Sequence, residues 1–151
     1  MPPTRMLRHM SSPVRRVLTI ALTAYVIVLM VVLLNPSPAA PSELVARVAS
    51  IGVRLGLPAP LVVPVRVEFG LNVLAFLPLS FLGSLLRPLV TLSAWTAGGF
   101  AGSLLVEIFQ TTLPNRSATH SDVVANTLGM ALGAMAAWFA RQSFDQLKDR
   151  P

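Results

Sequence analysis

The residues of this chain that could do chemistry form one short polar series between two strongly apolar stretches. The series combines two carboxylates with amides and a guanidinium, at Glu107, Gln110, Asn115, Arg116, Asp122 and Asn126. Such groups can bind a polar ligand, transfer a proton or form an ion pair. At the ends of membrane-spanning helices they are costly unless they are paired or used. The series therefore predicts either a functional site or a polar strut, by which we mean a set of polar contacts that only holds the helices together.

Glu107 is the most informative member, because apolar residues flank it on both sides. A carboxyl group in that setting is either ion-paired, which makes it a strut, or positioned to exchange a proton. Gln110, one helical turn later, offers a donor and an acceptor beside it. Arg116 has three interpretations: an ion-pair partner for Glu107 or Asp122, a group that recognises an anionic ligand, or a solvated loop arginine.

Asp122 and two asparagines have simpler structural interpretations. Asp122 follows a serine and precedes an apolar run, so we expect its carboxylate to cap the last helix. That role still leaves it able to orient Arg116. Asn72 and Asn126 are expected to form polar contacts between helices, worth about 1 kcal/mol each in lipid. With the series above, they make up a predicted cluster of Asn72, Glu107, Gln110, Arg116, Asp122 and Asn126.

The sequence contains no motif that indicates a particular catalysed reaction. The sequence lacks G-x-S-x-G, a phosphate-binding loop and H-E-x-x-H. It has no cysteine, and its two histidines, His9 and His120, lie in different flanks. Metal sites usually need three or four ligands. We therefore predict that the protein holds no metal and no cofactor, and we assign no catalytic residue.

The composition indicates a membrane protein. Of the 151 residues, 54% are hydrophobic and 12% are charged, whereas soluble domains carry roughly a quarter charged residues. We predict an all-α fold, a small polytopic membrane bundle of four transmembrane helices at about 17–34, 69–86, 89–109 and 123–139. The first run is just long enough to cross ~30 Å of hydrocarbon. Its alternative is a signal peptide cleaved after Ala40.

The region between the first two spans is a proline-rich linker at 35–64. Within it, Ser42 and Glu43 could cap a short helix through Leu57. Its apolar residues recur at helical spacing, so this helix either lies at the membrane surface or packs on the bundle. Further on, Pro78 is expected to kink the second span. The short turn at Arg87 then makes spans two and three antiparallel.

The basic residues set the expected topology. They cluster in segment 1–16 before the first span and in the tail 141–151, around the membrane domain at 17–140. Cytoplasmic flanks carry this excess, so we expect both termini in the cytoplasm and the polar series outside. The net charge of +6 forms no stripe with interleaved aromatics, which argues against nucleic-acid binding. Membrane lipid is the expected partner.

Small residues predict how the helices pack. Gly98 and Gly102 lie four apart on the third span, as do Gly129 and Gly133 on the fourth. Rows of small residues let helix backbones approach closely in lipid. We expect spans three and four to pack through these rows. The alternative is that one row forms a homo-oligomer.

At these positions the chain resembles the VanZ-like family of bacterial membrane proteins. The resemblance rests on the stretch from Asn72 through Pro78, on Glu107-Ile-Phe-Gln110, on Arg116, and on Asp122-Val-Val-Ala-Asn126 with Gly129 and Gly133. It covers residues 68–140. Thr119 departs from the family, which more typically has an acid there. Founding members are associated with low-level resistance to teicoplanin, a lipid-tailed glycopeptide, so the resemblance implies a role in the cell envelope.

Three hypotheses follow. The first is a non-enzymatic envelope protein whose outward cluster binds an amphiphilic or lipid-linked ligand, or a partner protein. The second is a membrane-embedded enzyme on a lipid-linked substrate, with Glu107 or Asp122 as general base. The third is a small carrier that uses Glu107 as its proton site.

Overall fold

The computed structural model describes residues 11–35, 37, 39–113 and 119–148. These residues form α2 (Ser12–Leu34), α3 (Ala39–Arg54), the 3-10 turn η1 (Ala59–Leu61), α4 (Pro64–Leu86), α5 (Leu92–Gln110) and α6 (His120–Lys148). The described part contains no strand, which confirms the all-α prediction. Within the described residues, four helices are long and apolar enough to cross a membrane: α2, α4, α5 and residues His120–Phe144 of α6. The four-span prediction is therefore confirmed as well.

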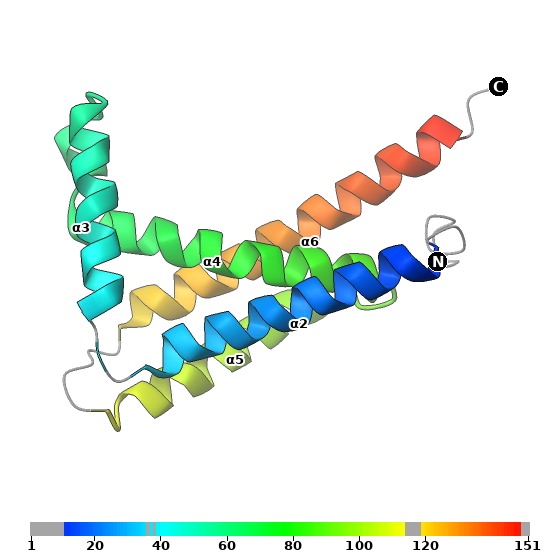
Figure 1. The fold of residues 1–151 in the computed structure, drawn as a ribbon, viewed down its shortest axis with the longest axis horizontal. Helices are drawn as coiled ribbons and strands as arrows, with labels where there is room; N and C mark the ends of the chain where they lie inside the picture. The colour runs from blue at the N-terminus through cyan, green and yellow to red at the C-terminus, as the bar shows by residue number, and fades with distance from the viewer. Residues whose placement is uncertain (1–10, 36, 38, 114–118, 149–151) are drawn as a thin grey trace.

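The four long helices lie lengthwise beside one another (Figure 1). Helices α2 and α5 run in one direction, and α4 and α6 run in the other. We call the end where α2 begins and α6 ends the tail end, and the opposite end the loop end. Helix α3 lies crosswise at the loop end, where α4 and α6 begin (Figure 1).

The helix bounds differ from the expected ones where local signals were stronger than hydropathy. Helices α2 and α4 begin earlier than expected, each with a proline in its first turn, where a missing N–H costs nothing. Helix α5 begins three residues late, because the Thr91 side chain accepts a hydrogen bond from the Ala94 N–H at 3.1 Å and caps it. Helix α3 spans Ala39–Arg54 rather than starting at Ser42.

The glycines Gly129 and Gly133 of α6 pack against α4. A Cβ atom added at either one would lie closer than 3.0 Å to a backbone carbonyl oxygen, that of Val73 or Leu77. Only glycine permits this approach. Helix α6 accordingly packs more extensively against α4 than against α5.

Helices α5 and α6 pack against each other as expected, but not through the predicted rows of small residues. Gly98 and Gly102 meet nothing within 4 Å in the described structure, so they do not form the seam with α6. The inward glycine of α5 is Gly99, where a Cβ would lie 2.7 Å from the Cβ of Met130. A shift of one residue turns a helix face by about 100°. The four-residue spacing indicated that small residues lie on one face of the helix, but it did not show which face of α5 points into the bundle.

The interior of the bundle is small and largely polar. Helix α5 buries only Gly99, Ser103, Glu107 and Gln110, while large side chains such as Phe100 and Leu105 remain exposed on it. In water this distribution would be unfavourable. In a bilayer the exposed apolar faces meet acyl chains, and polar contacts hold the helices together. The burial pattern thus matches the membrane assignment.

Candidate functional site

Helices α5 and α6 are antiparallel, and the residues that face each other advance by the same number along both helices. Their contacts therefore form successive layers along the bundle. Gly99 contacts Met130, and four residues along both helices the Ser103 hydroxyl accepts a hydrogen bond from Asn126 Nδ2 at 2.8 Å. Another four residues toward the loop end bring Glu107 beside Asp122. We call Ser103 and Asn126 the amide layer, and Glu107, Asp122 and Asn72 the carboxylate layer.

In the carboxylate layer, Asp122 joins two helices. Its Oδ1 accepts a hydrogen bond from Asn72 Nδ2 of α4 at 2.7 Å, and its Oδ2 accepts one from the Thr119 hydroxyl at 2.8 Å. The predicted contact role of Asn72 is therefore seen, with Asp122 as its partner. Asp122 is not the helix cap that we expected. Helix α6 begins at His120, so this carboxylate lies inside the first turn, where it complements the helix dipole.

Glu107 is buried in the same layer, with 8% of its surface exposed. Asp122, His120 and the backbone of Thr119 are its electrostatic neighbours. Its Oε1 atom has no hydrogen-bond partner in the part of the chain that the structure describes. The interaction between Glu107 and Asp122 is unfavourable when both carboxylates are ionised, and His120 acts in the opposite direction. The layer therefore favours an additional hydrogen-bond donor or cation.

The amide layer lies one turn deeper. Asn126 is 4% exposed, and its amide nitrogen binds the Ser103 hydroxyl. The Asn126 Oδ1 atom lacks a partner among the described residues. Each polar layer thus contains one buried oxygen with unused acceptor capacity. Ser103 was not predicted as a site residue, although it lies one turn before Glu107 on the same helix face.

One predicted member of the cluster, Gln110, lies outside these layers. The structure places Gln110 against α2, where its Nε2 donates to the backbone oxygen of Leu33 at 2.8 Å. That carbonyl belongs to the last turn of α2, where backbone oxygens have no helical partner. Gln110 therefore ties α5 to the end of α2. Arg116 lies outside the described residues.

A buried arginine at the tail end was not predicted. We expected Arg141 to begin the C-terminal tail 141–151, but it lies within α6, is only 8% exposed, and its Nη1 donates to the Ser84 backbone oxygen at 2.7 Å. In a continuing helix that oxygen would accept from the residue four positions later. This residue is Pro88, which has no N–H. Arg141 thus caps the end of α4, and the proline was the available signal.

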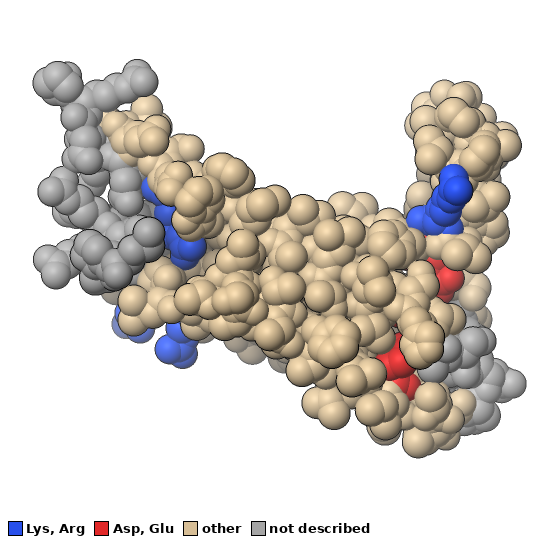
Figure 2. Space-filling view, turned by 180° about the vertical axis from the view of Figure 1, so that it is seen from behind, with Lys and Arg blue, Asp and Glu red and all other residues tan. Residues whose placement is uncertain are grey.

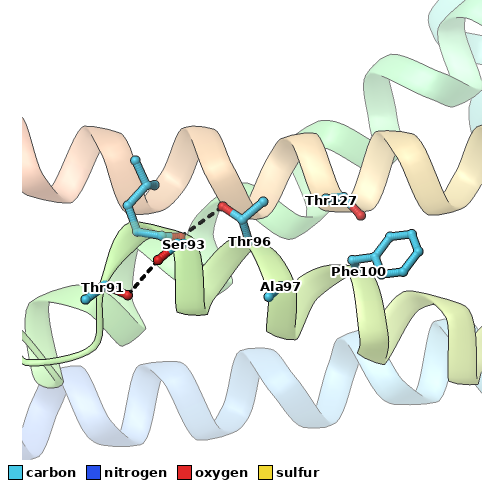
Figure 3. Close-up of a pocket in the computed structure, with 7 residues that line it drawn as sticks. Thr91, Ser93, Thr96, Ala97, Phe100 and Thr127 are labelled. Atoms are coloured by element: carbon cyan, nitrogen blue, oxygen red, sulfur yellow. Dashed lines mark hydrogen bonds between the residues drawn. The ribbon is translucent and has the colours of Figure 1, made fainter.

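The hollow between α5 and α6 is a separate feature (Figure 3). It is lined by Thr91, Leu92, Ser93, Thr96, Ala97, Phe100 and Thr127, none of which belongs to a polar layer. The hydroxyls of Thr96 and Thr127 bind backbone oxygens of their own helices. The hollow therefore presents mainly methyl groups and an aromatic ring, which suits lipid contact rather than chemistry.

Charged side chains gather at the two ends of the bundle (Figure 2). On the face shown, acidic residues lie at the loop end, basic residues lie at both ends, and the surface between the ends is uncharged. Among the described residues, no group of three or more His, Cys, Asp or Glu side chains could hold a metal ion.

The comparisons with known proteins agree with this layout. A family model described as VanZ/LLP1 matches residues 22–141. The chain belongs to the VanZ/LLP1 family. The match begins inside α2 and ends at Arg141, so it contains both polar layers and the cap of α4. It also extends beyond the resemblance seen from the motifs, which covered residues 68–140. No curated protein and no solved structure matches the chain.

Proposed function

We propose that this member of the VanZ/LLP1 family is a non-enzymatic protein of the bacterial cell envelope that binds an amphiphilic or lipid-linked ligand at its carboxylate layer. The family assignment and the four apolar helices support a multi-pass membrane protein. The association of founding members with teicoplanin resistance supports a ligand that combines a polar head with a lipid tail.

One observation carries the proposal: the buried Glu107 Oε1 has no partner among the described residues, and a second carboxylate lies beside it. A buried polar atom without a hydrogen bond costs about 1–3 kcal/mol. A ligand hydroxyl, amide N–H or ammonium group removes that cost. Because Glu107 is buried, only a small donor group enters the layer. The apolar part of the ligand remains in the surrounding bilayer.

The proposed orientation puts this layer on the outer side. By sequence position, eight of the twelve Lys and Arg residues flank the spans at the tail end: Arg5, Arg8, Arg15, Arg16, Arg87, Arg141, Lys148 and Arg150. Basic residues concentrate on the cytoplasmic side of membrane proteins. Both termini are then cytoplasmic, and the loop end faces the cell wall.

The test measures thermal unfolding of the protein in lipid nanodiscs, with Trp95 and Trp138 as reporters. The probes are teicoplanin, the same glycopeptide without its acyl chain, and a polyprenyl-linked sugar. We expect each lipid-tailed probe, teicoplanin and the polyprenyl-linked sugar, to raise the melting temperature and the deacylated glycopeptide to leave it unchanged. Glu107→Gln replaces one of the two carboxylate oxygens with an NH2 donor and removes the negative charge, so we expect it to weaken binding about tenfold, equivalent to ~1.4 kcal/mol.

The matched control is Thr112→Val at the same end of the bundle, because that hydroxyl binds the Phe109 backbone oxygen and lies outside both layers. It should bind the probes like the wild type. The absence of a shift with both lipid-tailed probes would overturn the proposal. Unchanged binding by Glu107→Gln together with a lower melting temperature of the free protein would identify Glu107 as a strut instead.

A further inference from the structure

Helix α3 is fixed crosswise at the loop end by local packing. It contacts α4, and it ends in a Schellman motif, in which Leu57 N–H donates to Gly52 O and Gly56 N–H donates to Val53 O, both at 3.0 Å. Gly56 has φ +75, a conformation that glycine adopts without strain. A Cβ at Gly52 would lie 2.7 Å from the Val62 side chain, so α3 also packs on its own connector.

Three different stripes run along α3. One stripe packs inward and contains Val45, Val48, Ala49 and Gly52, all at least half-buried. A second stripe is apolar yet exposed: Leu44 is 52% exposed, Ile51 53% and Leu55 75%. These three residues are spaced seven and four apart, so they share one face.

The third stripe is charged and lies beside the apolar one. Glu43, Arg47 and Arg54 share this face, since Arg47 is four residues from Glu43 and seven from Arg54. Arg47 Nη2 bonds Glu43 Oε1 at 2.6 Å. An apolar stripe flanked by a stripe in which basic residues predominate is the pattern of a helix that lies in the interface of a bilayer.

The neighbouring helices indicate what surrounds the apolar stripe. Helix α3 connects α2 to α4, both long and apolar enough to span the membrane, and it runs across their ends (Figure 1). That position is the level at which hydrocarbon gives way to lipid head groups. Burying a leucine or isoleucine side chain there is favourable by roughly 1.5–3 kcal/mol. Arginines at the same level can contact lipid phosphates.

We propose that α3 is an interfacial helix, with Leu44, Ile51 and Leu55 inserted into the acyl chains of one leaflet and Arg47 and Arg54 at its phosphates. The partner is the lipid surface itself. This inference does not rest on the proposed ligand-binding function, and it assigns α3 a second contact besides its packing on α4.

The test uses the fact that the chain contains no cysteine. Single cysteines are introduced at Leu44, Ile51 or Leu55, and as matched controls at Glu43 or Ser50. Each is labelled with the environment-sensitive dye NBD and reconstituted into vesicles of phosphatidylcholine and phosphatidylglycerol. All five side chains are exposed, so the substitutions should leave the fold intact.

Quenching then separates lipid from water. Lipids with a doxyl group near the top of the acyl chain should quench labels at the apolar positions several-fold more than the controls. Iodide, present on both sides of the vesicle, should show the reverse order. Equal iodide quenching at both sets would place the apolar stripe in water. Protection of the apolar set from both quenchers would indicate a protein contact, such as a second copy. Either result overturns the proposal.

Discussion

The close packing of α6 on α4 predicts a large difference between two identical substitutions. Gly133→Ala adds one methyl group whose Cβ would lie 3.0 Å from the Leu77 carbonyl carbon and closer still to its oxygen. Ordinary carbon contacts begin near 3.5 Å, so the helices must separate by roughly 1 Å. Overpacking of this kind costs about 1–3 kcal/mol. Gly102→Ala makes the same chemical change where nothing lies within 4 Å in the described structure.

Helix propensity works in the opposite direction, since alanine is better than glycine by about 1 kcal/mol at an exposed helical site. Gly102→Ala should therefore keep or slightly raise the free energy of unfolding, whereas Gly133→Ala should lower it by a net ~0–2 kcal/mol, so that the two variants differ by ~1–3 kcal/mol. The assay is unfolding in mixed detergent micelles on titration with SDS, followed by tryptophan fluorescence. Equal stability of the two variants would refute the assignment of Gly133 to the α4–α6 contact.

Three further predictions test single contacts, each by the same unfolding assay. Arg141→Ala should lower the free energy of unfolding by about 1–3 kcal/mol. Adding Pro88→Ala to this variant should recover part of the loss, because it restores the missing N–H. If the effects of the two substitutions on the free energy of unfolding were strictly additive, the capping role of Arg141 would be contradicted. Asp122→Ala should cost more than Asp122→Asn, because only the alanine variant leaves Asn72 Nδ2 without an acceptor, and equal losses would count against that bond. Tyr25→Phe removes a 2.6 Å hydrogen bond to a carbonyl of α4, so a loss of about 1 kcal/mol is expected, and no change would mean that this bond does not hold α2.

The sequence was sufficient for the membrane fold and for part of the candidate site. Apolar run lengths and sparse charge predicted four helices, and antiparallel topology brought Asn72 to the end of the bundle that contains Glu107 and Asp122. These inferences depend on hydropathy and on the order of the helices, both of which can be determined from one amino-acid sequence.

The remaining errors concern helix phase and backbone partners. Rows of small residues on α5 did not reveal that Gly99, rather than Gly98, faces inward, because both belong to plausible rows. Gln110 and Arg141 bind backbone carbonyls of other helices. Because every residue has a backbone carbonyl group, such pairings leave almost no pattern in the sequence. Pro88 is the exception, since its missing N–H leaves the Ser84 carbonyl without its helical partner.

The central claim is that the carboxylate layer is a binding site rather than a strut. Native mass spectrometry of the protein extracted from its own membrane tests this claim most directly, with wild type, Glu107→Gln and Thr112→Val compared at equal folded yield. We predict an amphiphile bound to the wild type and to Thr112→Val, and largely lost from Glu107→Gln. The same bound species in equal amounts on all three proteins, or none on any of them, would contradict the account.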